Sequence, residues 1–548
     1  MATDEALEGY VPFPPEFAER YRRLGYWEPK TFGERLDDWA ARFGERTAIV
    51  AGEERVSYHE LSRRADRLAG ALAALGVRRR DRVLLQLPNT VEFVCLSFAL
   101  FRIGALPIMA LPAHREAEIL RLLQFSEAAA YCAPASWRGF DYGAMIRSIA
   151  PKAPALKHVV IAGAAPAGTV PLDELLRARE AALPEGPEPS DVALFMLSGG
   201  TTGLPKLVPH THEDYACVMN LAAGHSGLAE DSVFLAVLPI SHNFSFGTPG
   251  VLGALSRGAK VVLAPTPSPE SAFPLIERER VTITSCTPAV AIQWLDSPLR
   301  ERHDLSSLRV MQVGGSRLPA EVAKRIKLEL GVTVQQVYGM AEGLNNITRL
   351  DDPEEVRFNT QGRPLCPADE VLVVGWDGKP APPGEPGELV TRGPYTIRGY
   401  YRAAEHNRVA FTQDGFYRTG DMVRRHPSGN LVVEGRKKDL INRGGEKISA
   451  EEVENLALGH ANVHMIAIVA MPDPVLGERS CAFVIPKPGR SLTLEELNGF
   501  LSAKKIAKFK LPERLEIVES FPVTAMGKVS KKALREQIAA RLGRVDGC

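Results

Sequence analysis

Paired cysteines are absent from this sequence, and their absence excludes two kinds of protein. The chain has 548 residues and seven cysteines, which are scattered and form no Cys-x-x-Cys pair. The cysteines show no metal-ligand spacing, and disulfide frameworks are typical of short, cysteine-dense secreted chains, so neither a structural zinc site nor a disulfide framework is expected. The cysteine usage instead fits a reducing compartment, and we expect a cytoplasmic protein.

The sequence also lacks an excess of charge of either sign. Lysine plus arginine and aspartate plus glutamate each number 66, which gives a formal net charge of zero. Proteins that bind nucleic acids or anionic membrane surfaces carry a basic excess. We therefore expect neither a nucleic acid nor a membrane as a partner.

Long apolar runs are missing as well. The most apolar segment covers residues 91–112, but two charged residues and two prolines interrupt it. A membrane-spanning helix needs about 20 consecutive apolar residues, so a buried helix followed by a strand is the better interpretation. The acidic start, MATDEALEGYVPFPPEF, has no apolar core of a signal peptide, so no leader is expected.

What the sequence does contain is a regular alternation of helix and strand patterns. Apolar residues at helical spacing predict a helix over residues 58–77, and short apolar runs such as RVLLQLP and KVVLAP predict buried strands. This alternation is typical of α/β layers with parallel sheets. A chain of this length exceeds one hydrophobic core, so two or more domains are expected.

The composition changes from about residue 370. Proline, glycine and short β runs predict a smaller β-rich piece, antiparallel or barrel-like, over about residues 370–437. Strand and helix patterns then return up to residue 548. We place the domain boundary in the charged stretch Arg436 to Asp439. The expected organisation is an N-terminal domain of residues 1–437 and a small α+β domain of residues 438–548.

A loop rich in glycine and hydroxyl groups, LSGGTTGLPKLV at residues 197–208, has the composition of a phosphate-binding site. It differs from the common P-loop because two residues separate its last glycine from the lysine. Its glycines let successive backbone N–H groups face one point. The candidate phosphate contacts are Ser198, Gly199, Thr201, Thr202 and Lys206. A flexible surface loop would show the same composition, so this motif alone leaves both interpretations open.

Four further motifs follow along the chain. They are VYGMAEG at residues 337–343, YRTGD at 417–421, EGRKKDLINRGGEK at 434–447 and PVTAMGKVSKKAL at 522–534. Considered alone, Tyr338 is best explained as a core residue, Asp421 as a turn residue and Lys528 as a solvated surface lysine. In this order and at these separations, the five motifs resemble the core motifs of the adenylate-forming superfamily, and the resemblance covers nearly the whole chain.

Longer segments narrow the resemblance. FPPEFAERYRRLGYW, LPISHNFSFGTPGVLGAL and TQGRPLCPADE are similar to segments of the stand-alone aryl-acid AMP ligases, whose archetype is the 2,3-dihydroxybenzoate–AMP ligase of siderophore assembly. The resemblance implies ATP-dependent activation of an aromatic carboxylic acid to an aryl adenylate. Transfer to the phosphopantetheine thiol of a carrier protein would follow. The sequence contains no carrier domain, so the expected partner is a separate aryl carrier protein or peptide synthetase.

The resemblance also implies what the motif residues do. Adenylation brings a carboxylate against a triphosphate, so catalysis must neutralise and align negative charge. Glu342 would bind Mg2+, and Lys528 would bridge the acid and the α-phosphate. The β- and γ-phosphates would be held by Ser198, Thr201, Thr202 and Lys206.

The same resemblance assigns the contacts to the nucleoside. Tyr338 would stack on adenine, and backbone groups near Gly315 and Val337 would read the edge of the base. Asp421 would accept both ribose hydroxyls, with Arg436 supporting the ribose or a phosphate. These residues lie far apart in the sequence, so the fold must bring them together.

The acid pocket implied by the resemblance is formed by His242, Asn243, Thr248, Gly314, Ala341 and Asn345. Amino-acid-activating relatives place an aspartate where Asn243 stands, and a neutral amide suits a substrate without an amine. The dihydroxybenzoate enzymes carry serine, valine and proline at Thr248, Asn345 and Ser245, so this pocket is more polar toward the distal ring edge. Salicylate, 3-hydroxyanthranilate and 3-hydroxypicolinate are therefore alternatives to 2,3-dihydroxybenzoate.

Two reaction steps in one site imply movement. Lys528 must cover the α-phosphate first, and the thiol needs that space later. Related enzymes resolve this conflict by rotating the small C-terminal domain, and Lys438 corresponds to the hinge.

Two rival functions stay open. A benzoate-type acyl-CoA ligase would share the first step and differ in its acceptor. A non-catalytic nucleotide-binding scaffold is a rival of another class, but the presence of Lys206, Glu342, Asp421 and Lys528 argues against it.

Overall fold

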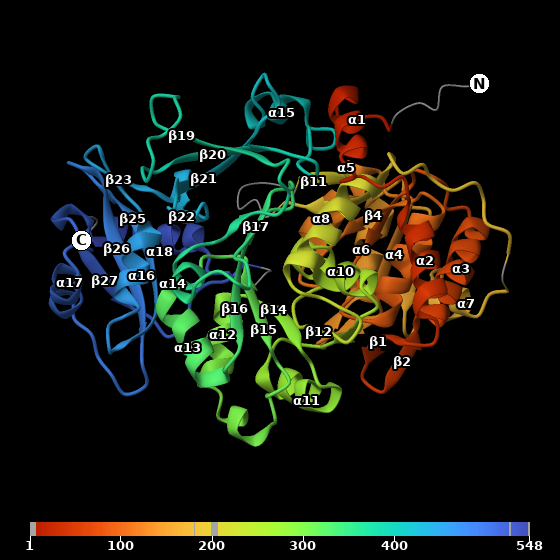
Figure 1. Cartoon of the computed structure of the whole chain (residues 1–548), viewed down its shortest axis with the longest axis horizontal. Coiled ribbons are helices and arrows are strands. Elements are labelled where there is room, and N and C mark those ends of the chain that lie inside the picture. The colour runs from red at the N-terminus through yellow and green to blue at the C-terminus, as the bar shows by residue number, and fades with distance from the viewer. Residues whose placement is uncertain (1–6, 180, 199–205, 525–527, 546–548) are drawn as a thin grey trace.

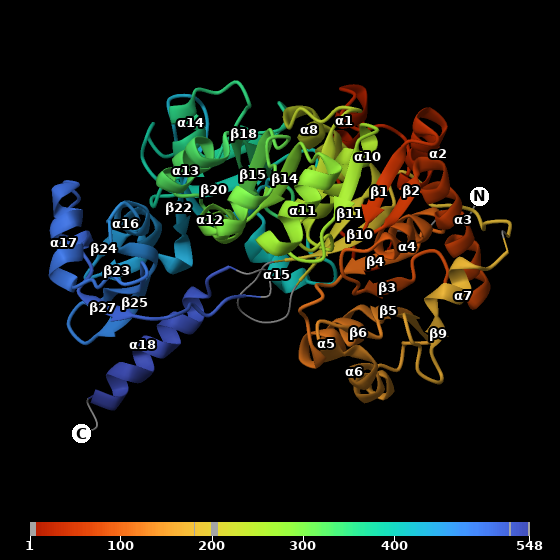
Figure 2. The same ribbon diagram turned by 90° about the horizontal axis from the view of Figure 1, so that it is seen from below.

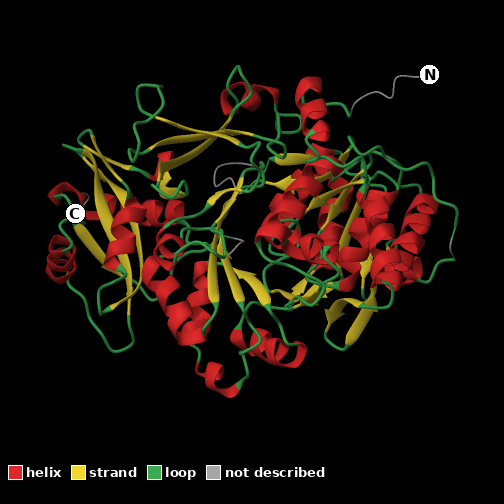
Figure 3. Ribbon diagram, viewed as in Figure 1, coloured by secondary structure: helices red, strands yellow, loops and turns green. Residues whose placement is uncertain are grey.

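The computed structural model describes residues 7–179, 181–198, 206–524 and 528–545. Two large sheets and the helices around them form most of the molecule, and two smaller sheets lie toward the C-terminal part (Figures 1 and 3). The α/β fold class expected from the sequence is confirmed. None of the helices in these ranges is both long enough and apolar enough to cross a bilayer.

The first large sheet has the strand order β11-β10-β4-β3-β5-β8-β9 in the described residues. Its pairings are parallel except at one edge, where β11 runs antiparallel to β10. The bounds are β3 Arg82–Leu85, β4 Leu106–Met109, β5 Ala130–Pro134, β8 His158–Ala162, β9 Val170–Pro171, β10 Val192–Leu197 and β11 Leu207–Thr211. The β10–β11 hairpin flanks the glycine-rich loop.

The second large sheet has the order β18-β17-β16-β15-β14-β12-β13-β1-β2. The six strands from β16 to β1 pair in parallel, and antiparallel strands close both edges. The bounds are β1 Thr47–Ala51, β2 Glu54–Ser57, β12 Val233–Ala236, β13 Lys260–Leu263, β14 Ile283–Cys286, β15 Val310–Gly314, β16 Thr333–Gly339, β17 Asn345–Ile347 and β18 Arg363–Pro364. The expected parallel sheets are therefore present, with antiparallel edges that the sequence pattern did not indicate.

Helices cover these sheets, and their ends follow local sequence signals. Helix α3 begins after Ser57, whose side chain accepts the backbone N–H of Glu60, and ends at Gly76 in the left-handed conformation. The bounds are α1 Pro15–Arg23, α2 Phe32–Phe43, α3 Tyr58–Leu75, α4 Val91–Arg102, α5 Glu116–Ser126, α6 Tyr142–Ile149, α7 Leu172–Leu176, α8 His212–His225, α9 Asn243–Phe246, α10 Gly250–Ser256, α11 Pro269–Glu279, α12 Pro288–Asp296, α13 Ala320–Leu330, α14 Glu354–Asn359 and α15 Ala404–Ala410. Short elements between them are β6 Ser136–Trp137, β7 Phe140–Asp141, η1 Ala150–Lys152 and η2 Pro298–Arg302.

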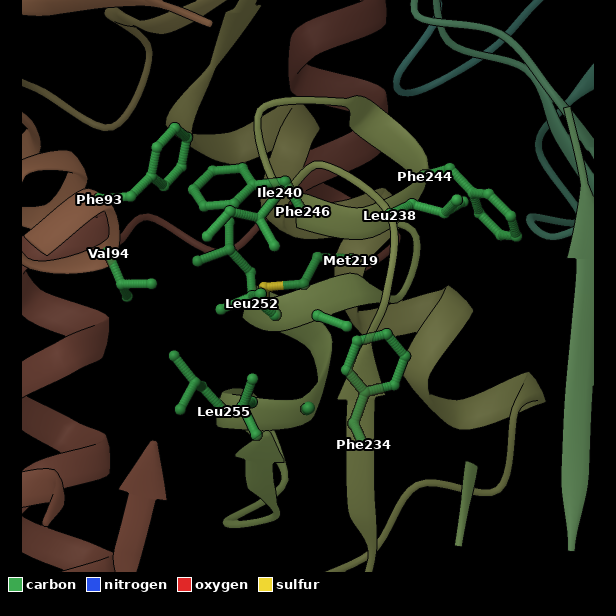
Figure 4. Close-up of a cluster of buried hydrophobic side chains, with 14 of the residues drawn as sticks. Phe93, Val94, Met219, Phe234, Leu238, Ile240, Phe244, Phe246, Leu252 and Leu255 are labelled. Carbon is green, nitrogen blue, oxygen red and sulfur yellow. The ribbon is translucent and has the colours of Figure 1, made fainter. Parts of the chain in front are cut away.

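The segment predicted as a buried helix and a strand is α4 followed by β4. Helix α4 is buried on almost every side, which explains its lack of a polar face. Figure 4 shows its Phe93 and Val94 meeting side chains of α8, α10 and β12 in one apolar cluster. Phe244 lies at the edge of that cluster, so the core holds the α9 segment in place.

The β-rich piece is an open antiparallel sheet with the order β19-β20-β21-β22. Its strands are β19 Glu370–Val374, β20 Gly387–Arg392, β21 Tyr417–Arg425 and β22 Leu431–Arg436. The barrel-like alternative considered from the sequence is wrong for the described residues, because β19 and β22 form opposite edges and do not pair with each other. The antiparallel alternative is the one that the structure has.

The C-terminal segment forms a five-stranded sheet in the described residues, with the order β24-β23-β26-β25 and β27 beside β26. Its elements are β23 Ile441–Arg443, β24 Glu446–Ile448, α16 Ala450–Ala457, β25 Val463–Asp473, β26 Gly477–Pro486, α17 Leu494–Ala503, η4 Lys508–Lys510, β27 Arg514–Ile517 and α18 Lys531–Val545. Two apolar clusters within residues 441–542 give this segment its own core.

These C-terminal elements gather at the end of the molecule opposite α2 and α3 in both views (Figures 1 and 2). The short helix η3, Lys437–Asp439, joins β22 to β23 and contains the predicted hinge, Lys438. The domain boundary and the hinge stay predictions at this point.

Candidate active site

Several predicted site residues lie where strands of the second large sheet end. Gly314 ends β15, and Val337 and Tyr338 lie at the end of the adjacent strand β16. Parallel strands have their carboxyl ends at one edge of a sheet, where ligands of α/β folds commonly bind. Strands β21 and β22 bring Asp421 and Arg436 to the same place, since these two residues are cross-strand partners.

Asp421 is the centre of one group of contacts. The Tyr338 hydroxyl donates to Oδ2 of Asp421 at 2.6 Å, and Nε of Arg436 lies 3.0 Å from Oδ1. Burial and the nearby Asp421 carboxylate raise the pKa of Tyr338 well above its ordinary value, so the phenol keeps its proton. Asp421 raises the pKa of Arg436. The structure therefore brings three of the predicted nucleotide contacts together around one carboxylate.

Lys528 enters this group from the other end of the chain. Gly315 has φ +88°, and a Cβ there would lie 3.2 Å from Cε of Lys528 and 3.6 Å from Cγ2 of Thr287. A side chain at position 315 would therefore compete with the lysine for space. The backbone N–H of Thr524 donates to the Lys528 carbonyl at 2.7 Å. Burial and the positive charge of Arg436 lower the pKa of Lys528 to about 8.

His242 lies at the start of α9, on the Lys528 side of the site. Its Nδ1 accepts the backbone N–H of Phe244 at 3.3 Å. Burial and the positive charge of Lys528 lower the pKa of His242 to about 3. His242 is therefore a neutral side chain that caps a short helix next to the lysine.

Asn243 is held from two sides. Its Oδ1 accepts the Tyr215 hydroxyl of α8 at 2.8 Å, and its Nδ2 lies 3.4 Å from the Met340 carbonyl. The Thr248 hydroxyl donates to the Asn243 carbonyl at 3.2 Å. Asn243 and Thr248, which the sequence analysis placed in one pocket, are thus in direct contact. Tyr215 had no role in that analysis, although it fixes the amide.

The other predicted pocket residues define the shape of the neighbouring wall. A Cβ on Gly314 would lie 2.8 Å from the Val337 carbonyl and 3.2 Å from the Phe244 ring. Asn345 faces Gly339 across β16 and β17. Its Nδ2 donates to the Gly343 carbonyl at 2.7 Å, so this donor is used inside the turn between the two strands.

Glu342 is buried, with 8% of its surface exposed. The Tyr400 hydroxyl donates to its Oε1 at 2.7 Å, and the hydroxyls of Tyr400 and Tyr417 are 2.9 Å apart. Nζ of Lys206 lies 5.5 Å from the centre of the Tyr400 ring. Tyr400 therefore connects the predicted metal ligand to the predicted phosphate-binding lysine. The sequence analysis assigned no role to either tyrosine.

The base of the glycine-rich loop is closed by two hydrogen bonds. The Ser198 N–H donates to the Lys206 carbonyl at 3.0 Å, and the Lys206 N–H donates to Oγ of Ser198 at 3.0 Å. Both residues extend the β10–β11 hairpin. The other predicted phosphate contacts, Gly199, Thr201 and Thr202, lie outside the described residues.

The described residues contain no group of three or more histidine, cysteine or carboxylate side chains that could hold a metal ion by themselves. Mg2+ does not need such a group, because it commonly binds one or two carboxylates together with water and substrate phosphate oxygens. Glu342 offers one oriented carboxylate on the Lys206 side of the site. The residues of this site therefore fit a Mg2+ ion that is bound jointly by Glu342 and the phosphates of a nucleotide.

The chain matches a protein family and has close relatives among known proteins. Residues 36–401 match the family described as AMP-binding enzyme, and residues 452–528 match the AMP-binding enzyme C-terminal domain. The chain is 53% identical to a 2,3-dihydroxybenzoate-AMP ligase of Bacillus subtilis, over 98% of this chain and 99% of that protein.

Other relatives differ in what their names say about the acceptor. A salicylyl-CoA synthase / salicylate adenylyltransferase of a Streptomyces species is 49% identical, over 98% of this chain and 99% of that protein. A salicyl-AMP ligase / salicyl-S-ArCP synthetase of Mycobacterium tuberculosis is 45% identical, over 99% and 97%. The apo structure of Mycobacterium smegmatis MbtA is similar with a TM-score of 0.76 and 42% identity, over 97% of this chain and 100% of that one.

Proposed function

The chain belongs to the AMP-binding enzyme family, and on this premise we propose that it joins an aromatic carboxylic acid to AMP and then passes the aryl group to a thiol. ATP supplies the AMP, and pyrophosphate leaves. The observation that carries the proposal is the meeting of Lys528 with Gly315 beside the Tyr338–Asp421–Arg436 group. The names of the close relatives support an aryl acid as the substrate.

The first step forms one bond and breaks another. A carboxylate oxygen of the acid bonds to the α-phosphorus of ATP, and the bond from that phosphorus to pyrophosphate breaks. Two anions must approach, so the residues contribute by neutralising charge and by alignment. Lys528 is assigned to the acid and the α-phosphate, and Lys206 with Ser198 to the outer phosphates.

Asp421 and Tyr338 are assigned to the nucleoside. A carboxylate with two free lone-pair directions can accept both ribose hydroxyls, and Arg436 holds Asp421 in its orientation. The Tyr338 ring offers a face to adenine while its hydroxyl is held by Asp421. Val337 and Gly315 supply backbone groups at the edge of the base.

Mg2+ is the metal that the residues fit. Glu342 would hold it, and Tyr400 would keep the carboxylate in place. The ion would supply positive charge between the phosphates. Lys206, on the same side of the site, complements that charge from the protein.

The acid pocket is assigned to Asn243, Thr248, Gly314, Ala341 and Asn345, with His242 at its border toward Lys528. The buried amide and hydroxyl of Asn243 and Thr248 suit a ring with an ortho hydroxyl and no ammonium group. We propose 2,3-dihydroxybenzoate or salicylate as the substrate, with 3-hydroxyanthranilate and 3-hydroxypicolinate as the alternatives.

Exchange of labelled pyrophosphate into ATP tests the first step. We expect exchange that depends on an aryl acid and on Mg2+, with salicylate or 2,3-dihydroxybenzoate at least about tenfold better in kcat/KM than benzoate. One lost hydrogen bond to a buried polar group accounts for such a ratio. Benzoate is the matched control because it lacks only the ring hydroxyls. No exchange with any aryl acid would contradict the proposal and favour a non-catalytic nucleotide-binding scaffold.

The acceptor is proposed to be the phosphopantetheine thiol of an aryl carrier protein or peptide synthetase, in siderophore or nonribosomal peptide biosynthesis. The thiol sulfur bonds to the acyl carbon, its proton is released and AMP leaves. The alternative is a benzoate-type acyl-CoA ligase. The name of one relative, salicylyl-CoA synthase, supports this alternative. Thioester formation with a phosphopantetheinylated carrier and with coenzyme A, measured side by side, distinguishes the two.

Tyr400→Phe tests the assignment of Glu342. Removing the hydroxyl leaves Oε1 of Glu342 without its 2.7 Å donor, so the carboxylate loses its fixed orientation. We expect the Mg2+ concentration that gives half-maximal exchange to rise about three- to tenfold, in line with one lost hydrogen bond to a charged group. Tyr401→Phe is the control, because this neighbouring buried ring packs on Phe195. Equal Mg2+ dependence in the two variants would contradict the assignment.

A further inference from the structure

Two buried histidines lie close together at the junction of β11 and α8. His210 is 1% exposed, and so is His212, two residues later. Neither residue belongs to a motif that the sequence analysis recognised. Their partners differ, however, and this difference assigns them different roles.

His210 is hydrogen-bonded through both ring nitrogens. Its Nδ1 lies 2.6 Å from Oδ1 of Asp214, and its Nε2 lies 2.7 Å from the Ala341 carbonyl. A carbonyl oxygen can only accept, so Nε2 carries a proton. The other oxygen of Asp214 accepts the N–H and the hydroxyl of Thr211, so this side chain is itself fixed. The ring of His210 is therefore held between Asp214 and Ala341, with its Nε2–H directed at the Ala341 carbonyl.

His212 shows the opposite arrangement. Its Nδ1 accepts the backbone N–H of Phe32 at 3.1 Å, so that nitrogen has no proton. Burial and the positive charge of Arg35 lower the pKa of His212 to about 3. Burial would also lower the pKa of His210, but the Asp214 carboxylate and the Ala341 carbonyl outweigh it and raise the pKa of His210.

The His210 ring contacts both walls of the proposed acid pocket. One wall is the turn that contains Ala341 and Glu342, and the bond from Nε2 holds its backbone at Ala341. On the other side, the ring centre lies 5.1 Å from the ring centre of Tyr215. Tyr215 in turn donates to Asn243. One side chain thus sets the distance between Ala341 and Asn243.

We propose that His210 is a positioning residue for the aryl-acid pocket, acting through its Nε2–H on the Ala341 carbonyl and through its packing on Tyr215. This inference rests on the proposed function. Asp214 fixes the ring through Nδ1 at 2.6 Å, so the Nε2–H stays directed at the Ala341 carbonyl. The nucleoside contacts have a separate set of partners around Asp421, so a change at His210 should leave them in place.

His210→Gln is the first test. A glutamine amide can donate to the Ala341 carbonyl only while it presents its oxygen to the Asp214 carboxylate. The side chain at position 210 should therefore no longer hold the Ala341 backbone in place. We expect the KM for the aryl acid in pyrophosphate exchange to rise about tenfold, while the KM for ATP stays within about twofold. His210→Arg should restore the acid KM to within about threefold, because a guanidinium stays charged and donates to both oxygens.

His212→Gln is the matched control, since it removes an equally buried imidazole two residues away. A merely structural role would lower the fraction of folded enzyme in both variants and leave both KM values unchanged. An acid KM in His210→Gln within twofold of the wild type would overturn the inference. If the wild type showed no acid-dependent exchange, the proposed function itself would have failed.

A measurement on the unmodified protein covers the case in which His210→Gln does not fold. Nitrogen-15 spectra of histidine-labelled enzyme should contain an imidazole whose Nε2 proton is hydrogen-bonded and slow to exchange with solvent, as expected for a ring that is 1% exposed. Its signals should move when salicylate is added, whereas the signals lost in His212→Gln should not. Absence of such a protected ring, or no response to salicylate, would overturn the inference without any variant of His210.

Discussion

Lys528→Ala is expected to slow adenylate formation by about 10²- to 10³-fold, the usual effect of removing one electrostatic contact at a reacting centre. Lys528 lies beside Gly315, at the side of the site where acid and α-phosphate would meet. Without the positive charge of Lys528, the repulsion between the carboxylate and the α-phosphate is no longer offset. Transfer from a preformed aryl adenylate should be nearly unchanged, since that step no longer joins two anions. Pyrophosphate exchange measures the first step, and thioester formation from added adenylate measures the second.

Lys532→Ala is the matched control for this variant. It removes the same charge four residues later, from a half-exposed side chain whose nearest carboxylate oxygen, on Glu536, is 3.8 Å away. Exchange should stay within about twofold of the wild type, as for most surface substitutions. An exchange rate in Lys528→Ala that matched Lys532→Ala would refute the role of Lys528.

The pH dependence of the first step provides a second test of the role of Lys528. Burial and Arg436 lower the pKa of Lys528 to about 8, and a lysine loses its positive charge as the pH rises through its pKa. The kcat/KM for the acid, which reports groups of the free enzyme, should therefore fall above about pH 8. Lys528→Ala should lack that fall.

Lys438→Pro is expected to separate the two half-reactions in the opposite sense. Lys438 lies in η3, between the last strand of the β-rich sheet and the first strand of the C-terminal sheet. Proline holds φ near about −65°, a value that a 3-10 helix already uses, so the orientation with Lys528 at Gly315 should persist. Exchange should stay within about threefold, whereas transfer to a thiol should fall at least about 100-fold if it needs rotation at this hinge.

Lys438→Ala is the control, because it removes the same side chain and leaves the backbone free to rotate. Both half-reactions should then stay within about threefold of the wild type. The measurement is again exchange beside thioester formation from preformed adenylate. If Lys438→Pro reduced both half-reactions equally, the hinge assignment would be wrong, and the variant would have disturbed the Arg535–Asp439 ion pair or the local fold instead.

The motifs were sufficient to predict that some distant residues become neighbours, while their roles stay proposals. Tyr338, Asp421 and Lys528 each have ordinary explanations alone, and only their order and spacing indicated a common site. The structure brings Tyr338 into contact with Asp421, 83 residues away, and Lys528 into the same corner.

The supporting residues could not be predicted in this way. His210 acts on Ala341 across 131 residues, and Tyr400 acts on Glu342 across 58. Neither pair has a spacing that local periodicity can reveal, because the contacts depend on which strands become neighbours. His210 and Tyr400 are donors directed at motif residues, and only the fold brings each donor to its acceptor.

The β-rich piece shows the same limit at the level of the fold. Proline, glycine and short apolar runs indicate strands and turns, but barrel closure depends on whether the first and last strands pair. That pairing is non-local, and here β19 and β22 remain at opposite edges. Strand content was therefore predictable while closure was not.

Lys528 follows the other proposed site residues in the chain, and this order matters during synthesis. Gly315, Tyr338 and Asp421 leave the ribosome before the lysine does. A nascent chain can thus assemble the surface for the nucleoside while it still lacks the charge assigned to the reaction. A chain that stopped before residue 528 should therefore bind ATP without supporting pyrophosphate exchange, if the proposed roles hold.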